Sequence, residues 1–540
     1  MQSEYDSKGI VAWFFRGILI LGITVLLGRL AELQVIKGGY YRELAEGNRI
    51  RRVAIAAERG EIHARGGEVL AGSSKVLKKL KFNKESGFET RDVDEDGESG
   101  DVIASFSREY KLGKALAHVG GYLGEANEAE VEKINPGCAD KGVVAGGSLV
   151  GRGGLEEQYE CALSGRSGEE LFEVDSAGHL VRRLGTRPAQ KGENLITNID
   201  FGLQERAAAL MEGKRGTVVV TDINGEILAL FSSPSYDPNL FIRGDFKEIT
   251  KLFNDNSKPF FNRAVSGIYH PGSVFKPIVA VAALEEKEID ENFVYEDRGQ
   301  IVVRTSQGDF SYSNWYFTQY GGVEGAITLK RAIARSTDTF FYKVGEMLGP
   351  DKIAEWAKKF GLGEKTGIDI PGEVAGLIPT PQWKKEVKGE NWFLGNTYHF
   401  SIGQGDLGIS PISINMATAA IASGKLCKPA IVGESECKSL DVDRQHLQLV
   451  KKGMTDACSE GGTASIFFDF LPKVACKTGT AETGANNKTH AWFTLIAPAE
   501  SDNANQIVMT VLVEEGGEGS VVAAPIAKDL LTYWLSNNEN

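Results

Sequence analysis

The chain has 540 residues, 42% hydrophobic and 25% charged, which is typical of globular proteins, excludes disorder and fibrous repeats, and leaves room for two or three domains. Its 60 Lys and Arg against 73 Asp and Glu give a net charge of −13, and no arginine-rich stretch offsets it, so we expect no nucleic-acid partner. Six cysteines without a C-x-x-C pair and seven scattered histidines give no support for a metal site, and we expect neither a metal nor a cofactor.

Residues 10–30, which read IVAWFFRGILILGITVLLGRL, are apolar and about long enough to cross a bilayer. Arg16 lies in this run, where its long side chain can reach toward the headgroups. The run is longer than the apolar part of a usual signal peptide, and no small-residue cleavage site follows it, which favours an uncleaved anchor over a cleaved signal. We therefore expect a tail at residues 1–9 and a transmembrane anchor at residues 10–30. The Lys and Arg residues on the two sides of the run are nearly balanced in number, so the cytoplasmic location of this tail rests on the function considered below.

The region after the anchor has mixed patterns. Residues 51–71 predict two strands joined by a turn at Gly66-Gly67. Residues 85–101 are strongly acidic and poor in apolar side chains, which predicts a solvated loop. The glycine-rich residues 142–154 lack the G-K-S/T ending of a phosphate loop, so we interpret them as a flexible connection.

The composition changes near residue 190. Beyond it, apolar strands at residues 217–221 and 226–231 lead into long helical patterns, and no internal repeat is visible. We therefore expect a first domain at residues 31–190 and a second domain at residues 191–540.

A candidate nucleophile lies in residues 269–277, YHPGSVFKP, before the apolar run IVAVAALEE. This run predicts a buried helix with Pro277 in its first turn, so Ser273 lies at the helix N-terminus and Lys276 lies one turn away. A serine hydroxyl needs a base to take its proton, and a buried lysine of lowered pKa can serve. Taken alone, a capping serine followed by an unrelated lysine explains the pattern equally well, since roughly two chance matches are expected in this length. Residues 435–438 are such a match, in a polar stretch.

A second candidate element follows about sixty residues later. Thr328 can cap a helix over residues 329–335 that breaks at Ser336-Thr337-Asp338, and a second helix then runs to Gly349-Pro350. A polar triplet between two helices can point a hydroxyl into a cleft, although a plain helix–helix turn is the more common meaning.

The third element is residues 472–481, which predict a strand with Lys477 and Gly479 on one face. A glycine leaves space where a ligand backbone approaches, so an extended peptide can add along this edge. Another K-T-G, at residues 365–367, follows a helix end and is interpreted as a loop.

Ser-x-x-Lys, Ser-x-Asp in place of Ser-x-Asn, and Lys-Thr-Gly, in this order and at these separations, resemble the motifs of the penicillin-recognising serine acyltransferases. The resemblance extends over nearly the whole chain to the class B penicillin-binding proteins, which are monofunctional peptidoglycan transpeptidases. The further segments that carry it are RGEI at 59–62, VLA at 69–71, GRGGLE at 151–156, TNID at 197–200, GEILA at 225–229, PSYDPN at 234–239, NRA at 262–264 and SIGQG at 401–405.

This family resemblance implies the fold. The expected class is α+β: a membrane anchor, an N-terminal pedestal domain of the dimerisation type, and a penicillin-binding transpeptidase domain whose antiparallel sheet is packed between helices. One departure is Ala64-Arg65-Gly66-Gly67, where the family has an Asp-Arg-Asn-Gly turn. The pedestal around the acidic segment is also short.

The resemblance also implies catalytic roles. Ser273 attacks the carbonyl of the penultimate D-alanine of a stem peptide, Lys276 accepts its proton, and Ser336 relays a proton to the leaving D-alanine. An amino group of a neighbouring stem then attacks the acyl-enzyme.

Further residues are implied for substrate binding. The backbone N–H groups of Ser273 and Thr480 form the oxyanion hole, and Lys477 with the hydroxyls of Thr478 and Thr480 holds the terminal carboxylate, along the edge that includes Gly479. Cys476 is expected to point to the opposite face as a core thiol.

Asp338 stands where asparagine is commoner, and in this it is similar to the elongation-type members, penicillin-binding protein 2. This implies a role in side-wall growth and cell shape, with a membrane glycan polymerase and elongation-complex proteins as partners. A carboxylate beside Lys276 would stabilise its ammonium form. We therefore hypothesise that other hydrogen bonds hold Asp338 off Lys276, or that Asp338 orients Ser336.

Several alternatives stay open. A D,D-carboxypeptidase or a β-lactamase-like hydrolase shares the three motifs but transfers the acyl group to water, and a non-catalytic cell-wall scaffold would keep the fold. The anchored pedestal favours transpeptidation, and intact Ser273, Lys276 and Lys477 argue against a scaffold. The resemblance further implies β-lactams as covalent inhibitors and a single-pass protein of the cytoplasmic membrane with its catalytic body outside. Cys427 and Cys437 can pair, or all six thiols can be reduced.

Overall fold

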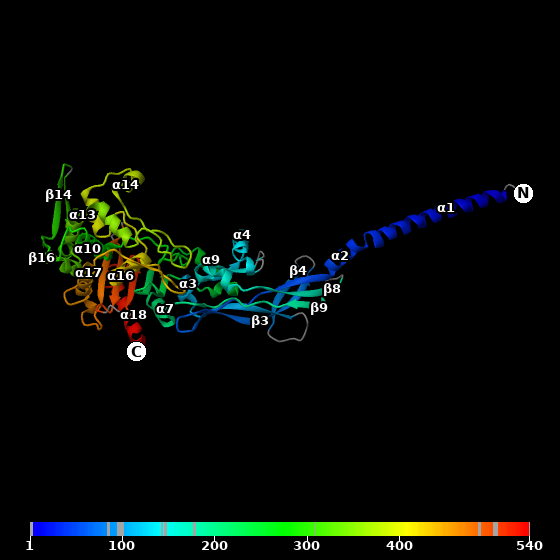
Figure 1. Ribbon diagram of the computed structural model, residues 1–540, viewed down its shortest axis with the longest axis horizontal. Coiled ribbons are helices and arrows are strands. Elements are labelled where there is room, and N and C mark those ends of the chain that lie inside the picture. Colours follow the sequence, from blue (N-terminus) through cyan, green and yellow to red (C-terminus); the bar gives the residue numbers. More distant parts are fainter. Residues whose placement is uncertain are drawn as a thin grey trace.

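The computed structural model describes residues 4–83, 87–93, 102–141, 144, 148–175, 180–306, 308–483, 488–500 and 506–538. Most of the predicted acidic loop, and residues 142–143 and 145–147 of the glycine-rich connection, lie outside these residues. The molecule is elongated: α1 projects at one end, long strands follow, and a compact body lies at the other end (Figure 1).

The N-terminal part of the chain runs from α1 to β10. Its elements are α1 (Glu4–Ala31), η1 (Glu32–Ile36), α2 (Gly38–Arg49), β1 (Ile50–Ile55), β2 (Ile62–His63), β3 (Val69–Asn83), β4 (Gly87–Val93), β5 (Val102–Tyr110), η2 (Gly113–Ala115), α3 (Ala117–Gly120), β6 (Tyr122–Glu125), α4 (Glu128–Gly137), η3 (Ala139–Lys141), β7 (Leu149–Arg152), α5 (Gly154–Gln158), α6 (Glu160–Leu163), β8 (Gly168–Val174), β9 (Leu180–Arg187) and β10 (Leu195–Ile196).

The compact body runs from α7 to α18. Its elements are α7 (Phe201–Leu210), β11 (Gly216–Asp222), β12 (Ile227–Ser233), α8 (Asn239–Arg243), α9 (Phe246–Phe253), η4 (Gly272–Phe275), α10 (Lys276–Glu285), β13 (Val294–Asp297), β14 (Gln300–Thr305), β15 (Gly308–Ser313), α11 (Trp315–Tyr320), β16 (Gly325–Thr328), α12 (Leu329–Arg335), α13 (Asp338–Lys359), α14 (Pro381–Trp383), η5 (Lys384–Lys388), α15 (Leu394–Ser401), α16 (Pro411–Ser423), β17 (Lys425–Cys427), β18 (Cys437–Ser439), α17 (Arg444–Ala457), η6 (Ser465–Phe467), β19 (Ala475–Glu482), β20 (Thr489–Ala497), β21 (Ile507–Val513) and α18 (Ala523–Asn538).

The predicted membrane segment is part of a longer helix. Gly9–Ile36 is the one helix in the described part of the chain that is long and apolar enough to cross a membrane, and no residue of its most apolar stretch is buried in the molecule. An apolar helix that is exposed all round is unfavourable in water, which is consistent with a membrane anchor.

The described strands after the anchor form two larger sheets and the pair β6-β7. One has the order β1-β8-β9, and the other has the order β10-β2-β3-β4, with β5 also paired to β3. The predicted turn at Gly66-Gly67 lies between β2 and β3. The prediction of a loop over residues 85–101 is wrong for residues 87–93, because these form β4 and their backbone groups are paired with β3.

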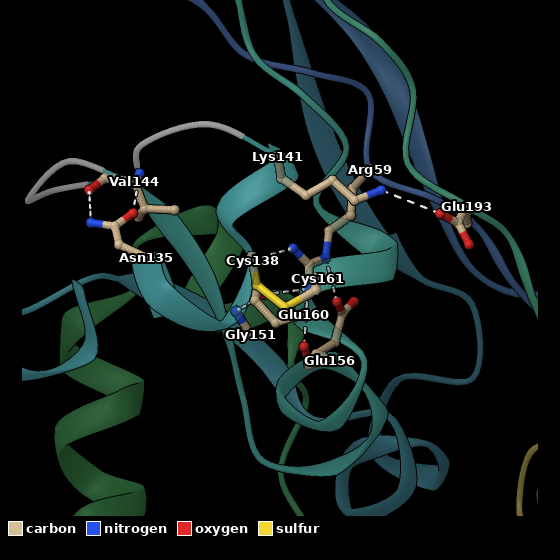
Figure 2. Close-up of a disulfide and its surroundings, with 10 residues drawn as sticks. All are labelled: Arg59, Asn135, Cys138, Lys141, Val144, Gly151, Glu156, Glu160, Cys161 and Glu193. Carbon is tan, nitrogen blue, oxygen red and sulfur yellow. Dashed lines mark hydrogen bonds and ion pairs between the residues drawn. A yellow bond between two sulfur atoms is a disulfide. The ribbon is translucent and has the colours of Figure 1, made fainter. Parts of the chain in front are cut away.

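Buried charges lie where these strands meet α5 and α6. Arg59 is hydrogen-bonded to Glu156 and, at 2.7 Å, to Glu160, and Arg108 donates to Glu156 at 2.9 Å. All four side chains are at least nine-tenths buried. Figure 2 shows Arg59 facing both glutamates, beside the disulfide Cys138–Cys161. The family-like segments RGEI and GRGGLE therefore meet in this cluster, where opposite charges offset the loss of hydration.

The body is built on a five-stranded antiparallel sheet of order β12-β11-β21-β20-β19 in the described residues. Helices α10, α13, α16 and α17 share a hydrophobic core on one face, and α7 and α18 cover the other (Figure 1). The strands are buried almost throughout, because both faces are covered. The predicted α+β fold, an antiparallel sheet packed between helices, is confirmed.

All six cysteines are paired: Cys138 with Cys161, Cys427 with Cys437, and Cys458 with Cys476. The open question about Cys427 and Cys437 is thereby answered. The expectation that Cys476 is a core thiol is wrong. The residue does face away from the Lys477 side of β19, but this face meets the C-terminal end of α17, where Cys458 lies.

Candidate active site

Ser273 lies in the turn that leads into α10. Gly272–Phe275 form a 3₁₀ turn, η4, and α10 begins at Lys276 with Pro277 in its first turn, so the predicted position before the helix is confirmed. Every residue of α10 from Lys276 to Leu284 is buried, as the all-apolar sequence predicts. Ser273 itself is half-buried.

Close backbone packing holds this turn in place. The N–H of Gly272 donates to the carbonyl of Gly403 at 2.8 Å. Gly403 has φ 79°, and a Cβ atom there would lie 2.1 Å from the Gly272 carbonyl oxygen. The SIGQG segment therefore needs glycine at this position, because a side chain would displace the turn that carries Ser273.

Lys276 joins the first motif to the second. Its side chain is fully buried, and its Nζ atom donates to the Ser336 carbonyl at 2.7 Å, to Ser336 Oγ at 3.2 Å and to Asp338 Oδ1 at 2.6 Å. These bonds use all three donors of an ammonium group. Ser336 has φ 56°, in the left-handed region, so the chain turns sharply between α12 and α13 and presents both its carbonyl and its hydroxyl to Lys276.

The hypothesis that Asp338 is held off Lys276 is wrong. One carboxylate oxygen contacts Lys276, and the other accepts the backbone N–H of Trp315 at 2.9 Å. Asp338 is the first residue of α13, so the sharp turn at Ser336 places its side chain on the same side as the Ser336 oxygens. The hydrogen bonds to Asp338 hold it against the amine instead of away from it.

Two buried amines share this site. Burial lowers the pKa of Lys276, while the charge and hydrogen bond of Asp338 raise it and cancel part of that effect. Burial also lowers the pKa of Lys477 well below its ordinary value, and the positive charge of Lys276 adds to this. Burial therefore makes it easier for both amines to lose a proton, and the charge of Lys276 adds to this effect at Lys477.

The third motif lies on β19, an edge strand of the sheet. Lys477 is fully buried and donates to the carbonyl of Thr478 at 3.0 Å, and the Thr478 hydroxyl donates to Thr463 Oγ1 at 2.9 Å. Thr480 is exposed at the strand edge. These positions leave the hydroxyl of Thr480 free to meet a ligand.

The structure gives a different reason for Gly479 than the predicted approach of a ligand. A Cβ atom at this position would lie 3.1 Å from the carbonyl oxygen of Pro271 and 3.2 Å from Val274. The missing side chain therefore lets the Ser273 turn pack directly on β19, and this contact unites the first and third motifs.

The other motif matches lie elsewhere. The second S-x-x-K match, at residues 435–438, lies at the start of β18, which forms a hairpin with β17. The second K-T-G forms a loop in which the backbone N–H groups of Thr366 and Gly367 donate to Glu373. No cluster of three or more His, Cys, Asp or Glu side chains that could hold a metal ion occurs in the part of the chain that the structure describes.

Sequence reasoning missed Asn314, Trp315 and Thr463. Asn314 precedes a short helical stretch and could have been identified as an N-cap. Its contact with the N–H of Asp338, 24 residues away, has no periodic signal in the sequence. The hydrogen bond between Thr478 and Thr463, fifteen residues apart, likewise has no signal in the sequence.

Two family models match the chain. The Penicillin binding protein transpeptidase domain matches residues 216–532, and the Penicillin-binding Protein dimerisation domain matches residues 98–197. The first match covers more than half of the chain and includes the three motifs described above. The chain therefore belongs to the penicillin-binding protein transpeptidase family.

Relatives with known names agree with this membership. A "Peptidoglycan D,D-transpeptidase MrdA" from Haemophilus influenzae is 31% identical, with 99% of this chain and 92% of the relative covered. The complex between Penicillin-Binding Protein (PBP2) and MreC from Helicobacter pylori has a TM-score of 0.77 at 25% identity and covers 91% of this chain and 99% of that chain. A structure titled "Structural coordination of polymerization and crosslinking by a peptidoglycan synthase complex" has a TM-score of 0.76 at 26% identity, covering 97% of each chain.

Proposed function

We propose that the protein is an elongation-type peptidoglycan D,D-transpeptidase that crosslinks stem peptides through an acyl-enzyme on Ser273. One observation carries the assignment: Lys276 binds both oxygens of Ser336, and the turn that carries Ser273 packs directly on Gly479 of β19, so all three motifs meet at one place. The near full-length similarity to a peptidoglycan D,D-transpeptidase supports the substrate class and favours transfer to an amine over hydrolysis.

Acylation begins with an uncharged Lys276. Burial makes loss of its proton easier, and the freed lone pair then accepts the proton of the Ser273 hydroxyl as its oxygen attacks the penultimate D-alanine carbonyl. The C–N bond breaks, and the terminal D-alanine leaves with a proton passed through the Ser336 hydroxyl, which already contacts Lys276. In the second transfer, an amine of a neighbouring stem attacks the ester and Ser273 regains its proton.

The strand edge holds the substrate. The backbone N–H groups of Ser273 and Thr480 stabilise the oxyanion, and the packing of Gly272 on Thr480 supports this pairing, since a Cβ atom at Gly272 would lie 3.2 Å from the Thr480 carbonyl oxygen. Lys477, Thr478 and Thr480 bind the terminal carboxylate. When bound, that carboxylate supplies the counter-charge that the buried Lys477 lacks, and so favours its ammonium form.

Asp338 has a balancing role. In the resting site it stabilises the charged form of Lys276, and it thereby sets the pH above which the base is available. An aspartate here is the feature that the chain shares with elongation-type members. We assign the protein to cell elongation and shape maintenance on this residue and on the named relatives.

Partners and location follow from the same likeness. The relatives bound to MreC and in a peptidoglycan synthase complex support elongation-complex proteins and a membrane glycan polymerase as partners, and β-lactams acylate Ser273. The protein crosses the cytoplasmic membrane once, with its body outside the cytoplasm. Three disulfides support this side of the membrane, because disulfides persist in oxidising compartments.

The division of the chain belongs to the same proposal: a tail at residues 1–9, an anchor at 10–30, a pedestal at 31–190 and a transpeptidase domain at 191–540. The family models support separate dimerisation and transpeptidase domains. β10 pairs with β2, so Leu195 and Ile196, just past the proposed boundary at residue 190, still lie on the pedestal sheet.

A fluorescent penicillin tests the assignment. The full-length protein is labelled in detergent, digested, and the modified peptide mapped. We expect a long-lived adduct on Ser273 that is absent in Ser273→Ala, and we expect Lys276→Ala to slow labelling at least 100-fold. Rapid release of hydrolysed penicillin would instead indicate a hydrolase, and a folded protein without any adduct would rule out the acyl-enzyme.

A further inference from the structure

Residues 294–306 and 308–328 form a folded insertion between α10 and α12, at the end of the molecule far from α1 (Figure 1). β13 pairs with β16, with Asp297 opposite Gly325, and β14 pairs with β15. The insertion contributes one backbone group to the catalytic residues, the N–H of Trp315 that binds Asp338. The residues that hold this N–H group in place therefore affect the geometry of the active site.

Asp297, at the end of β13, is 1% exposed, and its carboxylate accepts four hydrogen bonds. Oδ1 accepts from the N–H of Gly299 at 2.9 Å and from Thr339 Oγ1 at 2.6 Å. Oδ2 accepts from the N–H of Glu324 at 2.8 Å and from Asn314 Nδ2 at 3.3 Å. Four neutral donors therefore converge on one buried carboxyl group.

Two of these donors belong to residues that flank the Asp338 contact. Asn314 is fully buried, its Oδ1 accepts the N–H of Asp338 at 3.1 Å, and it directly precedes Trp315. Thr339 directly follows Asp338 on α13 and is also fully buried. Asp297 is therefore hydrogen-bonded to the sequence neighbour of each partner in the Trp315–Asp338 hydrogen bond.

We propose that Asp297 is a positioning residue of the acylation site: by holding Asn314 and Thr339 together, it fixes the Asp338 carboxylate against Lys276. The inference rests on the proposed roles of Ser273 and Lys276. The charged groups that face Lys276 are Asp338 on α13 and Lys477 on β19, and the ring of Phe341 lies 5.4 Å from its amine. Asp338 is the only one of them that favours the ammonium form by ion pairing.

Asp297→Asn tests the proposal. The amide keeps the size of the side chain, but its NH2 group must face two of the four donors, so two hydrogen bonds are lost. The acylation rate constant with a fluorescent penicillin is measured from pH 5 to pH 10. We expect the plateau rate to fall about 10-fold and the midpoint of the acid limb to move to lower pH by about one pH unit, because Asp338 is released from Lys276.

A double variant makes the test specific. If Asp297 acts through Asp338, the midpoint of Asp297→Asn/Asp338→Asn equals that of Asp338→Asn alone, since the two changes are not additive. A midpoint that moves further in the double variant would show a separate effect and would overturn the proposal.

Glu373→Gln is the matched control. Glu373 is 8% exposed and accepts from the N–H and hydroxyl of Thr366, each at 2.6 Å, and from the N–H of Gly367 at 2.9 Å. The control loses a buried carboxylate outside the site, so we expect a lower melting temperature and an unchanged midpoint. If Asp297→Asn also keeps the wild-type midpoint, its role is only structural and the proposal fails.

Thr339→Val covers the case in which Asp297→Asn does not fold. It removes one of the four hydrogen bonds, and we expect a smaller shift of the midpoint in the same direction; no shift would refute the proposal. Labelling of wild type and Ser273→Ala, run beside these variants, separates a failure here from a failure of the proposed function.

Discussion

At the scale of single residues, the site is a balance of charges in a buried space. Lys276 is fully buried and contacts a carboxylate, so two opposing effects set its pKa: burial lowers it and Asp338 raises it. Asp338 thus offsets part of the cost of burying the charged amine. As a consequence, Lys276 gives up its proton less readily than burial alone would allow.

Asp338→Asn measures this balance. Removing the negative charge leaves burial unopposed, so the pKa of Lys276 falls and the uncharged base is present at lower pH. We expect the acid limb of the acylation profile with a fluorescent penicillin to move to lower pH by about one pH unit or more. A profile identical to that of the wild type would show that the charge of Asp338 has no catalytic role.

At the scale of elements, the loop between α17 and β19 connects two motifs. The disulfide Cys458–Cys476 fixes the start of this loop to β19. Within the loop, Thr463 accepts the hydroxyl of Thr478 and donates its N–H to Ala334, which lies two residues before Ser336. The loop therefore sets the distance between the second motif and the carboxylate-binding strand.

Thr463→Val tests this connection. The hydroxyl of Thr478 loses its acceptor and gains freedom to rotate, so we expect slower acylation beside a loss of about 1 kcal/mol in stability for one buried hydrogen bond. Thr455→Val on α17 is the control, because its hydroxyl bonds only the carbonyl of Lys451. Equal acylation rates in the two variants would show that Thr463 does not support the active site.

At the scale of the whole molecule, buried polar groups hold the pedestal together and join it to the body. Glu156 accepts hydrogen bonds from Arg59, Arg108 and the hydroxyl of Tyr110. Burial raises its pKa, but the two guanidinium groups outweigh burial and hold the pKa below its usual range. Glu156 therefore stays charged at neutral pH.

Glu156→Gln leaves two buried guanidinium groups without their shared counter-charge. We expect a loss of about 3–5 kcal/mol in the free energy of unfolding, measured by chemical denaturation or by a fall in the melting temperature of the full chain. Glu109→Gln is the control, since its ion pair with Lys111 is exposed and should contribute under about 1 kcal/mol. A loss no larger than that of the control would contradict the role of the cluster.

His118 on α3 connects the two parts of the chain through a hydrogen bond between its Nε2 atom and the carbonyl of Pro259, at 2.9 Å. Burial lowers its pKa to about 4, although the bond to Pro259 acts to raise it. Between pH 6.5 and pH 4 the unfolded chain therefore binds a proton that the folded chain does not. Stability present above pH 6.5 is lost as the pH falls to about 4.

The size of this loss is on the order of 3 kcal/mol at pH 4. We expect His118→Gln, which can still donate to Pro259, to remove this part of the pH dependence. Chemical denaturation of wild type and variant between pH 7.5 and pH 4.5 gives the free energy of unfolding at each pH. If this free energy changes with pH equally in both proteins, His118 does not titrate in this way.

Much of the protein was predictable from local sequence. The apolar run at residues 10–30, the buried helix after Lys276 and the strand around Lys477 each follow from hydrophobic periodicity and end signals, which act over one or two turns or strands. The three motifs could be related to one chemistry because they belong to a known family pattern. Boundaries and mixed stretches were harder: the acidic residues 87–93 form β4 because β3 pairs with them.

The amino-acid sequence by itself determined which residue types are available: a serine, two lysines, an aspartate and a glycine-containing edge strand in a fixed order. Only the tertiary structure decided that Asp338 contacts Lys276, that Asn314 and Asp297 hold it there, that Gly479 makes room for the Ser273 turn, and that Cys476 pairs with Cys458. The physical reason is range. Periodicity and capping act between residues a few positions apart, whereas these contacts join segments 17 to more than 200 residues apart, and they form only when the sheet and its helices have packed together.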